Sequence, residues 1–74
     1  MEDYGKVYLN LDELIKEKGI SKNQLSYKSR MSHTQINKFC NGIAARIDLN
    51  TIARLCYALE CEVSELIIYE PPKK

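Results

Sequence analysis

The 74-residue sequence lacks the features that mark membrane and secreted proteins. It contains no run of about 18 apolar residues, which excludes a transmembrane helix of ordinary length. Its first ten residues are acidic and lack the apolar core of a signal peptide. We therefore expect an intracellular, cytoplasmic protein that does not bind a membrane.

The sequence also lacks the residue sets that carry out catalysis. It has one histidine, no glycine-rich phosphate loop, and no Ser-His-Asp set or pair of carboxylates that can be assigned to a cleft. Cys40, Cys56 and Cys61 are odd in number and form no CxxC pair. A zinc or redox site helped by His33 is one interpretation, but reduced thiols in or near the core are favoured. We expect no enzyme, no cofactor and no metal.

Basic and acidic residues nearly balance overall but are unevenly distributed. The net charge is +1, which alone argues against a strongly basic nucleic-acid-binding protein. Residues 16–54, however, carry eight basic and two acidic side chains, a charge of +6, and the two ends together carry −5. Such a charge dipole can orient a small protein on a polyanion, although a chance asymmetry remains the alternative.

Residues 21–42 predict two short helices joined by a tight turn. Ser21 and Ser32 are each followed three residues later by a glutamine, Gln24 and Gln35. In this capping box the serine oxygen accepts a backbone N–H and the glutamine reaches back to the cap. An apolar pair flanks each serine, as in a hydrophobic staple. One helix is therefore expected from Ser21 and another from Ser32.

The second helix of this pair, residues 32–40, has a polar face without acids. Its members are His33, Thr34, Gln35, Asn37 and Lys38. A solubilising face would usually mix glutamate and lysine. These side chains can instead bind base edges and phosphates in a major groove.

Helical spacing predicts three more helices. The first begins at Asn10 as its cap and ends at Gly19. The fourth begins at the cap Asp48 and is expected to be the centre of the core, through Leu49, Ile52, Leu55, Cys56 and Leu59. The fifth covers about 62–67, with Val63, Leu66 and Ile67 packing inward. In the second helix we expect Leu25 to be buried and Tyr27 to cover the core's edge.

Two segments with strand character lie outside the helices. We predict that Val7–Leu9 and Ile67–Tyr69 lie side by side and tie the two ends of the chain together. An isolated two-stranded ribbon is marginally stable in water, so it must pack on the helices or pair with a second subunit.

These segments together resemble the lambda-repressor-like helix-turn-helix domain of the Xre/Cro-type transcriptional regulators, in a compact subgroup. The resemblance is carried by LDELIKEKGIS, NQLSYKSRMSHTQINKFCNG, IDLNTIARLCYALE and CEVSELI. It implies an all-α, five-helix DNA-binding domain over residues 1–74, with the helix-turn-helix at 21–42 and antiparallel pairing of the terminal strands.

Two positions depart from the family pattern. Ser26 stands where the family usually has alanine, and it is small enough to allow close helix packing. Arg30 stands where the turn often has glycine. A left-handed conformation there costs arginine about 1 kcal/mol. Either the turn is longer or Arg30 gains a phosphate contact.

The resemblance also implies the roles of individual residues on DNA. Base edges are contacted by His33, Thr34, Asn37 and Lys38. Of these, Asn37 can pair bidentately with adenine and Lys38 can donate to guanine. Phosphates are bound by Ser21, Lys22, Gln35, Asn41 and Arg46. Gln35 is equally suited to capping the helix alone.

The function that follows is sequence-specific binding of double-stranded DNA by a transcriptional regulator, a repressor that acts as a homodimer. One alternative is an antitoxin-type DNA-binding protein whose protein partner binds its acidic ends. Another is a protein-interaction module with the same fold. That module would carry an acidic or apolar third helix, which is the opposite of the face seen here.

Overall fold

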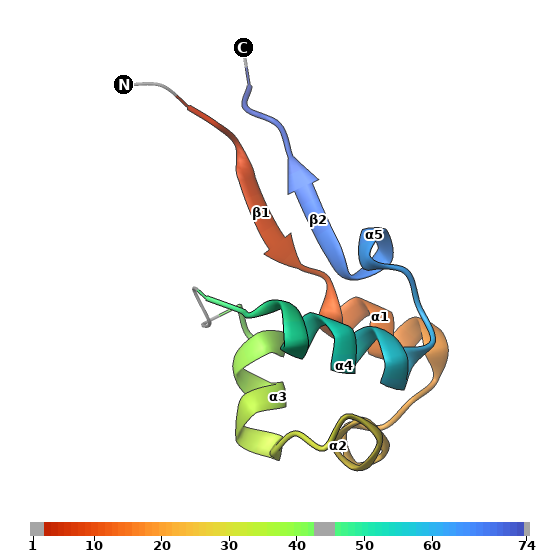
Figure 1. The fold of residues 1–74 in the computed structure, drawn as a ribbon. Coiled ribbons are helices and arrows are strands. Elements are labelled where there is room, and N and C mark those ends of the chain that lie inside the picture. The colour runs from red at the N-terminus through yellow and green to blue at the C-terminus, as the bar shows by residue number, and fades with distance from the viewer. Residues whose placement is uncertain (1–2, 43–45, 74) are drawn as a thin grey trace.

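The structure is a computed structural model that describes residues 3–42 and 46–73. In this part of the chain it contains five helices and one two-stranded antiparallel sheet (Figure 1). The elements in chain order are β1 (Lys6–Leu9), α1 (Leu11–Lys18), α2 (Lys22–Ser29), α3 (His33–Cys40), α4 (Leu49–Leu59), α5 (Val63–Leu66) and β2 (Ile67–Glu70). This architecture confirms the predicted five-helix domain with paired terminal strands. No helix in the described ranges is long and apolar enough to cross a membrane.

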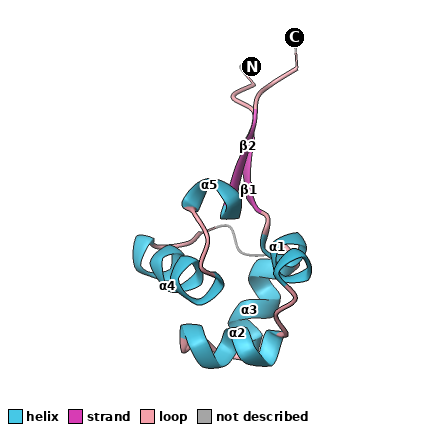
Figure 2. Ribbon diagram, turned by 90° about the vertical axis from the view of Figure 1, so that its right-hand side faces the viewer, coloured by secondary structure: helices cyan, strands magenta, loops and turns pink. Residues whose placement is uncertain are grey.

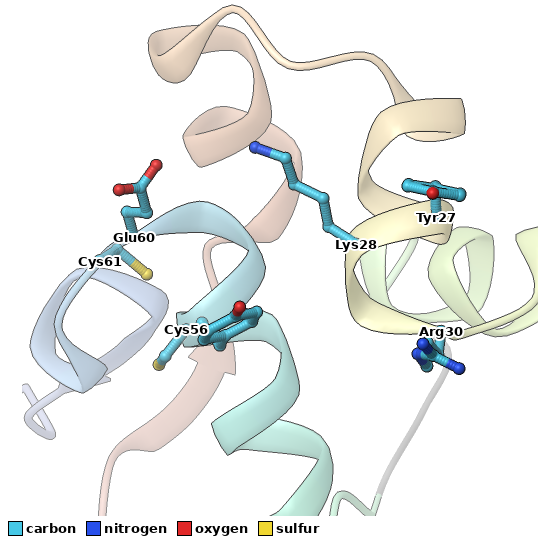
Figure 3. A pocket seen from close by; sticks show the side chains of 7 residues that line it. Tyr27, Lys28, Arg30, Cys56, Glu60 and Cys61 are labelled. Atoms are coloured by element: carbon cyan, nitrogen blue, oxygen red, sulfur yellow. The ribbon is translucent and has the colours of Figure 1, made fainter.

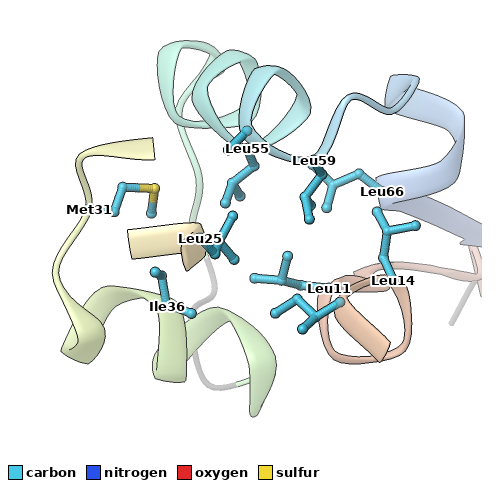
Figure 4. Packing of buried hydrophobic residues seen from close by; sticks show 10 residues of the cluster. Leu11, Leu14, Leu25, Met31, Ile36, Leu55, Leu59 and Leu66 are labelled. Atoms are coloured by element: carbon cyan, nitrogen blue, oxygen red, sulfur yellow. The ribbon is translucent and has the colours of Figure 1, made fainter. Parts of the chain in front are cut away.

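The hydrophobic core draws at least one buried side chain from each helix (Figure 4). The fully buried large side chains are Leu11, Leu25, Ile36, Leu55, Leu59 and Leu66. Each of them is apolar and contributes about 1.5–3 kcal/mol by leaving water. Because α2 and α3 are both anchored in this core, their positions relative to each other are set by packing.

The turn between α2 and α3 is tight rather than longer, and Arg30 adopts the left-handed conformation despite its steric cost. Arg30 has φ of 58°, and its N–H donates to the Ser26 carbonyl. The Ser26 hydroxyl donates to the Met31 carbonyl at 2.5 Å, and the buried Ser29 hydroxyl donates to the Leu25 carbonyl at 2.6 Å. Ser26 therefore closes the turn as well as allowing close packing, a role that the sequence did not reveal.

Three apolar side chains expected on the core are exposed instead. Leu49 is 83% exposed and Tyr27 is 87% exposed, and Val63 is also exposed. The buried side of α4 is centred on Leu55 and Leu59. Leu49 lies about a quarter turn from that side, because each helical residue adds about 100°. Ile52, about one turn further along α4, does pack against the core.

Asn10 and Asp48 occupy the N-cap positions of α1 and α4, as predicted, but within the described residues their side chains do not form the cap bond. The Asn10 side chain donates instead to the Glu65 carbonyl at 3.5 Å, and its backbone N–H donates to the Leu66 carbonyl at 2.7 Å. Asn10 therefore joins α1 to α5. The carboxylate of Asp48 accepts a bond from the Thr51 hydroxyl, which lowers the pKa of Asp48.

The strand ribbon rises from one end of the helical body, while α2 and α3 lie at the other (Figures 1 and 2). The two strands pair antiparallel, as predicted, and the register places Val7 opposite Tyr69 and Leu9 opposite Ile67. The molecule is accordingly elongated, 42 × 21 × 19 Å. Gly5 precedes β1 and has φ of +81°, a conformation that favours glycine. A Cβ there would collide with the Glu70 carbonyl, so only glycine allows the two strand ends to lie this close.

Candidate nucleic-acid interface

α3 has an apolar side anchored in the core and a polar side in solvent. Ile36 is fully buried and Phe39 is partly buried against the core. The four residues predicted to contact bases, His33, Thr34, Asn37 and Lys38, are all exposed. The anchor fixes which side of the helix faces outward, so the four polar side chains are presented together.

Both capping boxes of the helix-turn-helix are formed. At α3 the Ser32 hydroxyl accepts the Gln35 N–H at 3.2 Å, and the Gln35 side chain accepts the Ser32 N–H at 3.1 Å. At α2 the corresponding distances between Ser21 and Gln24 are 3.1 and 3.0 Å. The capping role of Gln35 is thereby confirmed, while its phosphate contact stays a prediction.

One contact joins the two predicted classes of DNA-binding residue. The Lys22 ammonium, at the start of α2, donates to Asn37 Oδ1 on α3 at 2.9 Å. Both side chains are exposed. The bond places a positive charge beside the centre of the polar face. It uses one of the two lone pairs of the Asn37 amide oxygen and leaves the amide NH₂ able to donate outward.

The charge of this surface has one sign. Neither α2 nor α3 contains an acidic residue, and both carry lysine. Asn41 at the end of α3 and Arg46 after it are exposed as well. All nine residues predicted to contact DNA are therefore accessible, and the surface around α3 is suited to a polyanion.

The three cysteines are free and partly buried against the core, as favoured from the sequence. Burial raises the pKa of Cys40. The pKa of Cys61 is raised to about 11. Burial is the largest cause, and the neighbouring thiol of Cys56 adds to it through its charge and a hydrogen bond. In the described ranges no three His, Cys, Asp or Glu side chains gather where they could hold a metal ion.

A hollow that the sequence did not predict lies between the C-terminal ends of α2 and α4 (Figure 3). Its volume is about 890 Å³, and it is lined by Tyr27, Lys28, Arg30, Cys56, Tyr57, Glu60 and Cys61. None of the nine predicted DNA-binding residues lines it. It forms only when α2 packs on α4, so no local sequence pattern could have indicated it.

Comparison with known proteins agrees with this geometry. The family model of the Cro/C1-type HTH DNA-binding domain matches residues 10–72. An uncharacterised HTH-type transcriptional regulator of Bacillus subtilis, YozG, is 27% identical over 63 residues, which cover 85% of this chain and 75% of YozG.

Two solved structures share the fold. A candidate DNA-binding protein from Bacteroides fragilis superposes with a TM-score of 0.75 at 16% identity, over 85% of this chain and all of the other. The restriction-modification controller protein C.AhdI from Aeromonas hydrophila gives a TM-score of 0.67 at 29% identity, over 74% of this chain and 82% of the other.

Proposed function

The chain belongs to the family of Cro/C1-type HTH DNA-binding domains, which are transcriptional regulators and not enzymes, and we propose that it is a repressor that binds specific double-stranded DNA sequences as a homodimer. Residues 1–74 act as one DNA-binding domain, with the helix-turn-helix at 21–42 and α3 in the major groove. The protein acts in the cytoplasm, on the DNA there, without a cofactor.

The observation that carries this proposal is the exposed, acid-free side of α3. An α-helix fits the major groove, where each base pair presents its own pattern of donors and acceptors. Lys38 donates to guanine, and Asn37 contacts base edges with its amide. His33 and Thr34, in the first turn of the helix, contact a thymine methyl group or the adjacent phosphate.

Phosphate contacts flank this reading helix. Ser21 and Lys22 lie at the start of α2, where the backbone N–H groups and the positive end of the helix dipole attract an anion. Gln35, Asn41 and Arg46 bind phosphates on the side of α3. Such contacts fix the register of the protein on the duplex without selecting a sequence.

Two copies are required because one recognition helix contacts only a few base pairs. Two-fold operators present half-sites about 34 Å apart, and two identical helices read them together. A dimer on such a site excludes other proteins from the same DNA, which is how repression follows from binding alone.

The test is selection of bound duplexes from a randomised DNA library, followed by fluorescence-anisotropy titration at two salt concentrations. We expect an enriched two-fold sequence that binds more tightly than a scrambled duplex, with affinity falling as salt rises. The bound operator should also reduce transcription in vitro. Failure to enrich any sequence, with equal weak binding to all duplexes, would contradict the proposal.

Substitutions separate the two classes of contact. Arg46→Ala should weaken binding to selected and scrambled DNA alike and lower the salt dependence by about one phosphate contact. Lys38→Ala should weaken binding to the selected sequence more than to the scrambled one. Both side chains are exposed, so neither change should affect folding.

A further inference from the structure

The strand ribbon has two chemically different faces. Alternation along the strands puts Val7, Leu9, Ile67 and Tyr69 on one face and Lys6, Tyr8, Ile68 and Glu70 on the other. The first set carries no charge and is apolar apart from the Tyr69 hydroxyl, whereas the second includes the ion pair between Lys6 and Glu70 at 3.7 Å. We call the first set the apolar ribbon face.

The apolar ribbon face is covered at its base and open at its outer half. Leu9 and Ile67 pack against the helical core. Their neighbours Val7 and Tyr69 are directly paired across the ribbon, yet they are 63% and 58% exposed. The Tyr69 hydroxyl donates to the backbone carbonyl of Tyr4, another exposed aromatic residue, at 2.9 Å. An apolar surface that begins in the core thus continues into solvent.

The base of the ribbon is stabilised by packing on the helices, but its outer half leaves the paired Val7 and Tyr69 in water. We propose that the apolar ribbon face is the surface by which two copies of this chain associate, with Val7 and Tyr69 of each copy packed on the same pair of the other. This inference rests on the proposed homodimeric function and assigns its interface.

Three features favour a second copy of the chain over another protein. The outer pair, Val7 and Tyr69, is uncharged, so it can meet an identical patch across a two-fold axis without placing like charges together. The net charge of +1 adds little repulsion between copies. The ribbon lies at the end of the molecule opposite α2 and α3, so its association leaves both DNA-binding faces free (Figure 1).

The size of the patch predicts the strength of the dimer. Val7, Tyr69 and Tyr4 of two copies bury less than the total of about 1,200 Å² that marks stable complexes. We therefore expect a dissociation constant in the micromolar range without DNA. Binding to a two-half-site operator should then be cooperative, because DNA brings the two ribbons together.

The experiment is sedimentation equilibrium of the full chain without DNA, for wild type, Val7→Glu and Tyr69→Glu. We expect a monomer–dimer equilibrium in the wild type and monomers in both variants at the same concentrations. Tyr57→Glu is the matched control, since Tyr57 is 80% exposed but lies on α4, away from the ribbon. It makes the same charge change and should leave the dimer intact.

Further measurements keep a folding defect apart from a lost interface. Circular dichroism should show native helix content in all variants. Val7→Thr keeps a β-branched side chain in the strand but is less apolar, and it should weaken the dimer at least several-fold. Wild type and Val7→Glu should bind one half-site with equal affinity, and only wild type should bind two half-sites cooperatively.

The outcomes are separable. The ribbon interface would be overturned if Val7→Glu and Tyr69→Glu formed normal dimers. Loss of the dimer in Tyr57→Glu, or in the further variant Leu49→Glu, would also overturn it and would indicate the exposed side of α4. A wild type that stays monomeric both free and on two-half-site DNA would also overturn it. Absence of half-site binding in dimeric wild type would contradict the proposed DNA-binding function and leave the ribbon interface supported.

Discussion

The ammonium group of Lys22 lies 2.9 Å from Oδ1 of Asn37 and joins the first turn of α2 to the outer side of α3. Bidentate pairing of asparagine with adenine needs the amide oxygen as an acceptor and the NH₂ group as a donor. In the free protein that oxygen is already bound to lysine. An amide oxygen has two lone pairs, so Asn37 can pair with adenine while it still accepts from Lys22, and the lysine charge then lies beside the base edge.

The contact between Lys22 and Asn37 predicts that the two side chains are coupled in DNA binding. Lys22→Ala, Asn37→Ala and the double variant should give affinity changes that do not add, with an interaction energy of about 0.5–3 kcal/mol. The measurement is a double-mutant cycle by anisotropy on the selected duplex. Lys22→Ala combined with Arg46→Ala is the control, and that pair should be additive. Additivity of the first pair would show that the contact does not operate on DNA.

The left-handed backbone at Arg30 predicts a stabilising substitution. Glycine adopts φ of 58° without the steric cost that a Cβ imposes, so Arg30→Gly should raise the free energy of unfolding by about 1 kcal/mol. Urea denaturation measures this. Arg30→Ala removes the same charge but keeps the Cβ, and it should bring no such gain. Equal stabilities of the two variants would refute the steric explanation.

The formed cap of α3 predicts a larger loss at Ser32 than at Asp48. Ser32→Ala removes the oxygen that accepts the Gln35 N–H, and this should cost about 1 kcal/mol. Asp48→Ala removes an exposed bond from the Thr51 hydroxyl but no full cap bond like that of Ser32, so its effect should be smaller. Thermal unfolding should show the melting temperature falling by about 4–8 °C for Ser32→Ala alone. The reverse order would contradict the capping geometry.

The raised pKa of Cys61 predicts an unreactive thiol and a loss of stability at alkaline pH. Burial, and then Cys56, raise this pKa from 9.0 to about 11, so the folded state holds the proton more tightly than the unfolded state. The resulting stabilisation is complete below pH 9 and is lost as the pH rises toward 11. At pH 8, iodoacetamide should modify Cys61 far more slowly in the folded than in the urea-unfolded chain, because the thiolate is the nucleophile.

The control for this pH dependence is Cys61→Ser, which has no thiol to titrate. Its stability should fall less between pH 9 and 11 than that of the wild type. Equal rates of modification of the folded and unfolded chains at pH 8 would contradict the assignment.

The elements that the sequence predicted correctly depend on local interactions. The capping boxes at Ser21 and Ser32 use residues three positions apart, so their pattern located both helix starts. The left-handed end of α1 at Gly19 is local as well. The two terminal strands were located from their β-branched and aromatic residues, whereas their register is a finding of the structure.

The errors concern features that depend on distant parts of the chain. Asparagine is a common N-cap residue, but the Asn10 side chain donates to the Glu65 carbonyl of α5 instead of capping α1. Leu49 matches helical periodicity and Tyr27 was expected to cover the edge of the core, but both are exposed, because burial depends on which neighbouring elements pack on a side chain. The bond between Lys22 and Asn37 likewise joins residues that become neighbours only when α2 packs against α3.

The most direct test of the DNA-reading surface is the ratio of affinities for the selected duplex and a scrambled duplex, measured for wild type and for Asn37→Ala combined with Lys38→Ala. Specific DNA-binding proteins prefer their sites by about 10³-fold or more. We predict such a ratio for the wild type and a ratio near one for the variant, with native circular dichroism in both. An unchanged ratio in the variant would show that α3 does not read the sequence.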